Sequence, residues 1–314
     1  MKPTVFAVRA LPGGVPAEVT ARAELRGGEA KPAPRERIHA EGVEAGILVV
    51  TYLDRVDDAL LDGLPNVRLV ASYGVGVNHV DLPAMARRGV VVTNTPDVLT
   101  DATADLAMAL LLAAARRVCE GDRLIRAGGW RDAGPEFLLG REVSGKTLGI
   151  VGFGRIGQAV ARRASGFGMR ILYASPRDAG YPGATRTDLD ALLATSDFVS
   201  LHCPLTDATR DLLSRERISR MKPGAVLVNT SRGPVVDEEA LADALADGRL
   251  FAAGLDVFRD EPRVPERLRR AENAVLTPHV GSGTVETRTA MGRMVWDEVL
   301  RRLTGRPPAF PVVI

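Results

Sequence analysis

Short apolar runs alternate with longer helical stretches along almost the whole chain. The runs are rich in β-branched residues and are apolar throughout, which is typical of strands that are covered on both faces. They predict a short strand within residues 1–10 and further strands at 46–50, 68–72, 90–94, 147–151, 170–175, 197–202, 225–230, 252–257 and 274–277. Buried strands that alternate with helices predict an α/β fold made of doubly wound parallel sheets.

Two landmarks divide this series into domains. Thr100 resembles the cap of a long helix at 101–117, which is apolar on nearly every side and which we expect to be buried between the domains. Gly281-Ser282-Gly283 precedes a last helix at about 284–303. We therefore predict a discontinuous first domain, residues 1–98 with 285–314, into which a second domain, residues 99–284, is inserted.

Composition excludes several classes of protein. The chain has 314 residues, 25% of them charged, and a formal net charge of +2 with no basic stripe, so a nucleic-acid surface is not expected. The longest apolar run, 106–115, is well short of the roughly 20 residues that a bilayer span needs. Cys119 and Cys203 have neither a CxxC nor a metal-ligand spacing, which argues against disulfides and against a metal site. We expect a cytoplasmic protein.

A glycine fingerprint follows the predicted strand at 147–151 and leads into a helical stretch at 158–165. It reads Gly152-Phe153-Gly154-Arg155-Ile156-Gly157. Gly152 allows the tight turn, Gly154 lets the backbone approach a pyrophosphate, and Gly157 lets helix and strand pack closely. Because the start of such a helix offers free N–H groups to phosphates, we interpret this segment as a dinucleotide site rather than as a turn without a ligand.

The end of the next strand bears on the choice of cofactor. NAD sites usually carry Asp or Glu there, but Ser175 occupies the expected position and Arg177 follows it. A hydroxyl and a guanidinium suit the 2′-phosphate of NADP, which a carboxylate would repel. We therefore favour NADP(H) and keep NAD(H) as the alternative, since Asp178 could serve the ribose if the register shifts and Arg177 could be a solvated surface arginine.

Three further residues follow predicted strands, whose carboxyl ends face the ligand crevice in open parallel sheets. They are Arg232, Glu261 and His279. A guanidinium here can hold the carboxylate of a 2-oxo acid and polarise its carbonyl, and a histidine can donate a proton to the forming alkoxide. Glu261 could accept a hydrogen bond from the other ring nitrogen and so fix the tautomer. The alternatives are a surface ion pair for Arg232 and a core position for His279.

A second possible contact to the substrate lies in the first domain. Gly74-Val75-Gly76 follows the strand at 68–72, and backbone N–H groups there could bind the substrate carboxylate from the opposite wall of a cleft. A plain turn is the alternative. Among the other histidines, His202 follows a strand, and we interpret it as structural or as part of the wall of the cofactor pocket.

These residues resemble the D-isomer-specific 2-hydroxyacid dehydrogenases over nearly the whole chain, and within them the glyoxylate and hydroxypyruvate reductases. The segments that carry the resemblance are 92–106, 140–157, 201–206 and 229–237. It implies a Rossmann nucleotide-binding domain inserted into a discontinuous flavodoxin-like substrate domain. It also implies reduction of a small 2-oxo acid, glyoxylate or hydroxypyruvate, to the D-2-hydroxy acid by a homodimer.

The resemblance assigns roles to individual residues. Arg232, Glu261 and His279 are the implied catalytic set, with His279 as the proton donor. Leu53, Val75 and Gly76 join Arg232 and His279 at the substrate, and Asp256 holds the nicotinamide carboxamide. The other implied cofactor contacts are Thr103, Gly152, Gly154, Arg155, Ile156, Gly157, Ser175, Arg177, Cys203, Pro204 and Thr230.

Two rival functions stay open. The nearer one is another enzyme of this family, such as a reductase of bulkier 2-oxo acids, a formate dehydrogenase or a phosphoglycerate dehydrogenase. The other is a cofactor-sensing regulatory protein like the corepressor relatives of the family, because such relatives can keep the same three polar residues.

Overall fold

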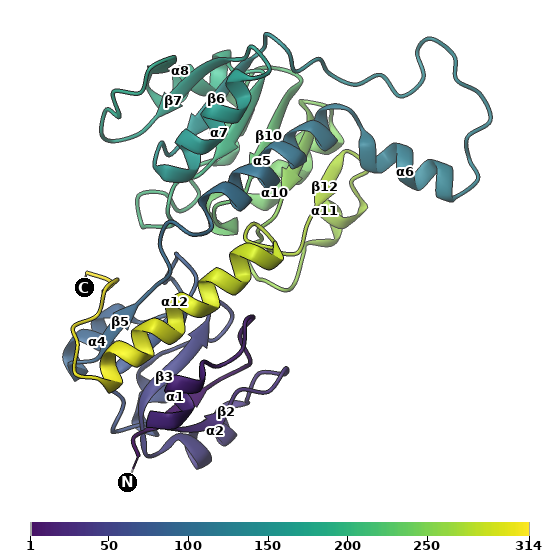
Figure 1. Ribbon diagram of the computed structural model, residues 1–314. Helices are drawn as coiled ribbons and strands as arrows, with labels where there is room; N and C mark the ends of the chain where they lie inside the picture. Colours follow the sequence, from purple (N-terminus) through teal and green to yellow (C-terminus); the bar gives the residue numbers. More distant parts are fainter. Residues whose placement is uncertain (1, 314) are drawn as a thin grey trace. The chain divides into compact units, whose positions relative to one another are not determined.

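The chain divides into two compact units in a computed structural model that describes residues 2–313 (Figure 1). The first unit contains the chain up to Leu99 and again from Gly283 onward, and the second contains Thr100–Ser282. The chain passes between the units at 99/100 and at 282/283. The sequence predicts these boundaries at 98/99 and 284/285, which differ by one and by two residues.

The first unit is built on a five-stranded parallel sheet in the order β2-β1-β3-β4-β5. This order, 2-1-3-4-5, is that of flavodoxin-like doubly wound sheets. Its strands are β1 (Thr4–Ala7), β2 (Glu24–Gly27), β3 (Ala45–Thr51), β4 (Leu69–Tyr73) and β5 (Val91–Thr93). Its helices are α1 (Ala17–Arg22), α2 (Arg35–Gly42), α3 (Asp58–Asp62), α4 (Leu82–Arg88) and α12 (Val285–Leu303).

Alternate residues of these strands enter two separate cores, one on each face of the sheet. Phe6, Leu48 and Val70 pack with apolar residues of α2, α3 and α4. Their sequence neighbours on the same strands pack instead with α12, whose Trp296 is almost fully buried. Both faces are therefore covered, which explains why the strand sequences are apolar throughout.

The second unit contains a seven-stranded parallel sheet in the order β12-β11-β10-β9-β6-β7-β8. Its strands are β6 (Thr147–Val151), β7 (Arg170–Ala174), β8 (Ala184–Arg186), β9 (Phe198–Leu201), β10 (Ala225–Asn229), β11 (Leu250–Leu255) and β12 (Ala274–Leu276). The chain order reverses between β6 and β9, as in Rossmann sheets, where ligands bind outside the carboxyl ends of the strands next to the reversal. The fold is thus α/β with two doubly wound parallel sheets, as the sequence predicts.

Helices cover both faces of the larger sheet. The helices of this unit are α5 (Thr100–Ala115), α6 (Val118–Arg126), α7 (Arg155–Ser165), α8 (Leu189–Thr195), α9 (Arg215–Arg220), α10 (Glu238–Ala246) and α11 (Glu266–Arg270), with a 3₁₀ turn η1 (Gly233–Val235). One core joins α5 and α7 to the sheet, and the other joins α8, α9, α10 and α11 to the opposite face.

Some details of the structure differ from the sequence-based prediction. The strands β2 and β8 were not predicted, because both are short edge strands with partly exposed, polar residues. Thr100 is the first residue of α5 rather than its cap, and α5 ends at Ala115 because Arg117 adopts a left-handed conformation, with φ of 53°. The helix packs against α7, β10 and β11 of its own unit, and nine of its sixteen residues are buried.

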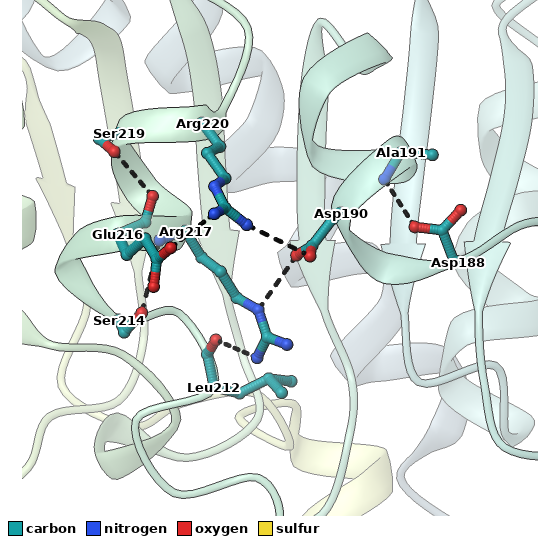
Figure 2. Close-up of polar contacts among 9 residues, drawn as sticks. All are labelled: Asp188, Asp190, Ala191, Leu212, Ser214, Glu216, Arg217, Ser219 and Arg220. Atoms are coloured by element: carbon teal, nitrogen blue, oxygen red, sulfur yellow. Dashed lines mark hydrogen bonds and ion pairs between the residues drawn. The ribbon is translucent and has the colours of Figure 1, made fainter.

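An ion-pair network joins α8 and α9 on the surface of the second unit (Figure 2). Asp190 accepts a hydrogen bond from Arg217 Nε at 3.2 Å and from Arg220 Nη1 at 3.4 Å, and Arg217 also donates to the carbonyl of Leu212 at 3.0 Å. These side chains are 35–52% exposed, so each pair contributes little to the free energy of unfolding. The two helices also share an apolar core, to which Leu192, Leu193 and Ile218 contribute.

Across residues 2–313, no helix is both long and apolar enough to cross a membrane.

Candidate active site

The predicted chemical residues lie at the carboxyl edge of the seven-stranded sheet. Arg232 follows the end of β10, Asp256 follows β11 directly, and His279 lies three residues beyond the end of β12. The three strands are neighbours in the sheet and run parallel, so their carboxyl ends meet at one edge. The sheet therefore brings together side chains that are up to 47 positions apart in the sequence, from Arg232 to His279.

His279 and Glu261 form a partly buried pair. The imidazole Nδ1 lies 2.6 Å from Glu261 Oε2, and Glu261 Oε1 accepts a hydrogen bond from the Phe258 N–H at 3.0 Å. Burial alone would raise the pKa of the Glu261 carboxyl, but the hydrogen bond from His279 and the nearby positive charge of Arg232 hold this pKa below its usual value. An ionised Glu261 fixes the proton on Nδ1, so Nε2 is the ring nitrogen that can exchange a proton with a substrate.

The backbone at His279 is strained and is held by Asp256. His279 has a φ of 52°, a conformation that non-glycine residues rarely adopt. Its N–H donates to the Asp256 carbonyl at 2.8 Å. The Asp256 carboxylate accepts from Val280 N–H and Gly281 N–H, each at 2.8 Å, and from the Thr277 hydroxyl at 2.6 Å. Asp256 thus anchors the loop on both sides of His279, a role that the sequence did not suggest.

Asp256 is almost fully buried, with 1% of its surface exposed. This burial raises the pKa of its carboxyl, while the hydrogen bonds from Thr277 and Val280 and the charge of His279 act in the opposite direction. Both carboxylate oxygens already accept from this loop. The backbone of Gly281 also lies next to the side chain of Thr103 in the first turn of α5. Thr103 is therefore close to the loop that Asp256 holds.

Arg232 is held by a side-chain turn that starts at the end of β10. Asn229 accepts hydrogen bonds from the Ser231 N–H at 3.0 Å and hydroxyl at 2.8 Å, and its own amide donates to the Arg232 carbonyl at 3.0 Å. The Arg232 guanidinium donates to the Ser231 carbonyl at 2.6 Å. Asn229 is 1% exposed, so this turn is fixed from inside the protein.

Gly233 allows the Arg232 loop to approach the loop that carries Glu261. A Cβ at this position would collide with the backbone of Phe258 and Arg259. Only glycine permits so close a contact between two backbones. Arg232 is consequently close enough to Glu261 for its charge to lower the pKa of that carboxyl.

The glycine fingerprint forms a cradle at the start of α7, which begins at Arg155, earlier than the sequence predicts. Gly152 has a φ of 88°, and a Cβ there would collide with the backbone of Cys203. A Cβ at Gly157 would collide with the Gly152 carbonyl, whereas one at Gly154 would meet nothing within 4 Å. The helix has no side-chain cap and no acidic residue in its first turn. The start of this helix and the open space over Gly154 fit the pyrophosphate of a dinucleotide.

The end of β7 carries the residues that bear on cofactor choice. Ser175 follows the strand and Arg177 is exposed. The Asp178 carboxylate accepts hydrogen bonds from the Tyr173 hydroxyl and from the Gly180 N–H at 3.0 Å. Both contacts use the Oδ1 atom of Asp178, whose side chain is exposed to solvent.

His202 directly follows β9 and contacts Thr230, which directly follows β10. Its Nε2 is 2.8 Å from the Ser200 hydroxyl, and its Nδ1 is 3.4 Å from the hydroxyl of Thr230. Burial lowers the pKa of His202 to about 4, so the ring is neutral at pH 7. Cys203, the next residue, is also buried, and burial raises the pKa of its thiol to about 11.

The neutral state of His202 predicts a specific loss of stability in acid. An unfolded histidine titrates near 6.5, so the unfolded chain binds more protons than the folded one as the pH falls from 6.5 towards 4. Over this window His202 should remove about 2–3 kcal/mol from the free energy of unfolding. The His202→Gln variant should lack this component, which urea unfolding of both proteins at pH 7 and pH 4.5 will measure. An equal acid-induced loss in the two proteins would contradict the prediction.

The residues expected at the substrate from the first unit follow the neighbouring strands β3 and β4. Leu53 lies in the turn after β3 and is 51% exposed. Gly74, Val75 and Gly76 follow β4, and Gly74 has a φ of 152°. The Val75 carbonyl accepts a hydrogen bond from the Asn94 amide at 2.8 Å, which fixes this turn.

Within residues 2–313, no group of three or more His, Cys, Asp and Glu side chains is arranged to hold a metal ion.

Comparisons with known proteins give the family. Residues 108–281 match the family model described as D-isomer specific 2-hydroxyacid dehydrogenase, NAD binding domain. The chain is 45% identical over 317 aligned positions to the glyoxylate reductase of Thermococcus litoralis, with 98% of this chain and 96% of that protein covered.

Solved structures agree with this match. A protein of Thermus thermophilus is 46% identical, with a TM-score of 0.91 and coverage of 99% of this chain and 100% of that one. An NADPH-dependent glyoxylate/hydroxypyruvate reductase of Sinorhizobium meliloti, solved with NADP and malonate, is 33% identical, with a TM-score of 0.86 and coverage of 100% and 97%. The chain therefore belongs to the D-isomer-specific 2-hydroxyacid dehydrogenases and is an NAD(P)-dependent oxidoreductase that acts on 2-oxo acids.

Proposed function

We propose that this protein reduces glyoxylate and hydroxypyruvate to glycolate and D-glycerate, with NADPH as the preferred cofactor. The observation that carries the proposal is the His279–Glu261 pair beside Arg232 at the carboxyl edge of the nucleotide-binding sheet. The names of the relatives, glyoxylate reductase and glyoxylate/hydroxypyruvate reductase, support the choice of substrate.

In the proposed mechanism, Arg232 binds the substrate carboxylate and polarises the neighbouring carbonyl oxygen. His279 donates the proton from Nε2 to that oxygen as it becomes an alkoxide, and Glu261 stabilises the protonated ring through Nδ1. A nicotinamide cofactor held in this site would supply the hydride for the carbonyl carbon. The backbone N–H groups of Val75 and Gly76 bind the substrate carboxylate as well, and Leu53 lies beside a small substrate.

The cofactor would be held along the carboxyl edge of the same sheet. Gly152, Gly154 and Gly157, with the N–H groups of Arg155 and Ile156, would bind the pyrophosphate. Thr103, Cys203, Pro204 and Thr230 would line the pocket, and Asp256 would contact the nicotinamide carboxamide. In this arrangement the unit Thr100–Ser282 is the nucleotide-binding domain and the other unit is the substrate domain.

The preference for NADPH rests on Ser175 and Arg177. Neither residue repels a 2′-phosphate, and the carboxylate of Asp178 accepts hydrogen bonds from Tyr173 and Gly180. The hydroxyl and the guanidinium offer donors to the phosphate oxygens. NAD(H) would bind to the same glycine cradle but would lack the contacts between a 2′-phosphate and the side chains of Ser175 and Arg177.

Two glycines of the cradle make a matched pair of variants. Because a Cβ at Gly154 meets no atom within 4 Å, Gly154→Ala should leave the melting temperature nearly unchanged while it blocks the approach of the pyrophosphate. We expect the Kd of NADPH to rise at least about tenfold, which corresponds to about 1.4 kcal/mol. Gly157→Ala should instead destabilise the fold, since its Cβ would collide with the Gly152 carbonyl. Fluorescence titration and thermal melts will separate the two effects, and tight NADPH binding by Gly154→Ala would contradict the proposed position.

The family resemblance implies a homodimer built through the nucleotide-binding domain, with the region 101–117 contributing. We propose that α6 and the long loop after it contribute to the interface as well (Figure 1). No residue of α6 is buried, although the helix is strongly amphipathic. The segment exposes the large apolar side chains Val118, Ile125, Trp130, Phe137 and Leu139. Exposed apolar residues in this number mark an interaction surface. Light scattering should give twice the chain mass of 33.5 kDa for the wild type and a smaller mass for Ile125→Glu with Trp130→Glu.

A substrate panel tests the proposed reaction against its rivals. We expect the highest kcat/KM with glyoxylate and hydroxypyruvate, and D-glycerate as the product from hydroxypyruvate. A higher kcat/KM with phenylpyruvate would favour a reductase of bulkier 2-oxo acids. NADPH binding without turnover of any 2-oxo acid would favour the sensing protein.

A further inference from the structure

We propose that Arg186 is a further determinant of cofactor specificity, which holds the Ser175–Asp178 loop in the conformation that receives a 2′-phosphate and adds positive charge beside it. This inference rests on the proposed preference for NADPH and names a residue that the sequence did not indicate. The structure supplies three observations for it: the position of Arg186 in the sheet, its contacts, and the internal contacts of the loop.

Arg186 is the last residue of β8, the edge strand of the larger sheet. Strands β7 and β8 run parallel, and Arg186 is paired with Tyr173, two residues before Ser175. Arg186 therefore lies at the carboxyl edge of the sheet, directly beside the strand end that receives the adenosine ribose in Rossmann domains.

The guanidinium of Arg186 binds two consecutive carbonyl groups of the loop. Its Nε donates to the Ser175 carbonyl at 3.2 Å, and its Nη2 donates to the Pro176 carbonyl at 2.9 Å. The rigid fork of an arginine can hold two neighbouring acceptors at once, which a lysine cannot do in the same way. The contact compensates two partial negative charges that would otherwise lie uncompensated beside a phosphate.

An aromatic cluster contacts the loop as well. The Tyr173 hydroxyl binds the Asp178 carboxylate and accepts a hydrogen bond from the Ala179 N–H at 3.2 Å. The Tyr173 ring stacks on Phe153, the second residue of the glycine fingerprint, with a centroid distance of 4.0 Å. One oxygen of the exposed Asp178 carboxylate is therefore held within the loop. The hydrogen bond from Tyr173 lowers the pKa of this carboxylate, and the charge of Arg186 also acts on it and lowers its pKa. The stacked Phe153 ring ties the same loop to the glycine fingerprint.

The segment from Ser175 to Arg186 carries a net positive charge. Between Ser175 and Arg186 the charged residues are Arg177, Asp178 and Arg186, which gives a net charge of +1, with the single carboxylate bound by Tyr173. At the 2′ position NADH has only a neutral hydroxyl, whereas NADPH has a phosphate that carries up to two negative charges. Arg186 should thus affect the binding of phosphorylated cofactor selectively.

The test measures binding of NADPH, NADH, 2′,5′-ADP and 5′-AMP to the intact protein by titration calorimetry. For Arg186→Ala we expect the Kd of NADPH and of 2′,5′-ADP to rise about tenfold, with less than a twofold change for NADH and 5′-AMP. Arg186→Lys, which keeps the charge but not the fork, should give an intermediate Kd for NADPH.

Arg170→Ala is the matched control. Arg170 is exposed and begins β7, so its replacement removes the same charge from the adjacent strand at the opposite edge of the sheet. It should leave all four Kd values within twofold of those of the wild type. The thermal melts of all three variants should stay close to that of the wild type.

The outcomes distinguish the role of Arg186 from the proposed preference for NADPH. A wild type that binds NADPH and 2′,5′-ADP no better than NADH and 5′-AMP overturns both. A wild type with the expected preference, together with an Arg186→Ala variant that keeps it or that weakens all four ligands equally, overturns only the role of Arg186. Because the readout is binding, the result does not depend on which 2-oxo acid the enzyme reduces.

Discussion

Replacing His279 with alanine is expected to lower kcat for glyoxylate reduction by about 10²–10⁴-fold, because the variant lacks the positioned general acid. The ring is held by Glu261 at 2.6 Å, so the proton donor is already oriented when the substrate binds. The Kd of NADPH should stay within about threefold of the wild-type value, since the pyrophosphate cradle is formed by other residues. Steady-state kinetics and a fluorescence titration with NADPH measure the two quantities.

The control for this variant is His39→Gln. His39 lies in α2 of the other unit, where its Nε2 is 3.0 Å from the Leu60 carbonyl, and it has no part in the proposed chemistry. Its kcat should match that of the wild type. Turnover by His279→Ala within about fivefold of the wild type would remove His279 from the mechanism.

Asp256→Asn should lower kcat by about 10–100-fold while it leaves the fold intact. Both carboxylate oxygens accept N–H groups of the loop around His279, and an asparagine offers only one acceptor oxygen. Its NH₂ group would face the Gly281 N–H or the Val280 N–H, and a buried donor without an acceptor costs about 1–3 kcal/mol. The strained backbone of His279, with a φ of 52°, would then relax and displace the imidazole.

Kinetics and binding together distinguish this anchoring role from a contact with the nicotinamide. An asparagine can still hydrogen-bond a carboxamide, so the Kd of NADPH should change by less than about threefold while kcat falls. Asp260→Asn makes the same substitution at an exposed neighbouring position and should have no effect on either. A large rise in the Kd of NADPH with an unchanged kcat would contradict the anchoring role.

Much of the fold could be predicted from the sequence, because strands that are covered on both faces carry uninterrupted apolar runs. Residues such as Leu48 and Leu227 lie in cores that the pattern alone indicates. All of the predicted strands after residue 10 occur within two residues of the expected bounds. The edge strands β2 and β8 escaped prediction because one side of each faces solvent and carries polar residues.

The candidate site could be predicted as far as it depends on topology. Parallel strands end at one edge, so the positions of Arg232 and His279 after two such strands predict that both lie at that edge of the sheet. The anchoring of His279 by Asp256, and the contact of Arg186 with the Ser175 loop, depend on side-chain directions and distances between separate strands. No local pattern in the sequence encodes such contacts, since aspartate after a strand and arginine in an edge strand are both common.

We propose that this enzyme reduces glyoxylate with NADPH as its preferred cofactor. The most direct measurement is kcat/KM for glyoxylate reduction with NADPH and with NADH, side by side on the same preparation. We predict turnover with both cofactors and a kcat/KM that is at least about tenfold higher with NADPH. Equal or NADH-biased values would contradict the role of Ser175 and Arg177, and no turnover with either cofactor would contradict the proposed substrate.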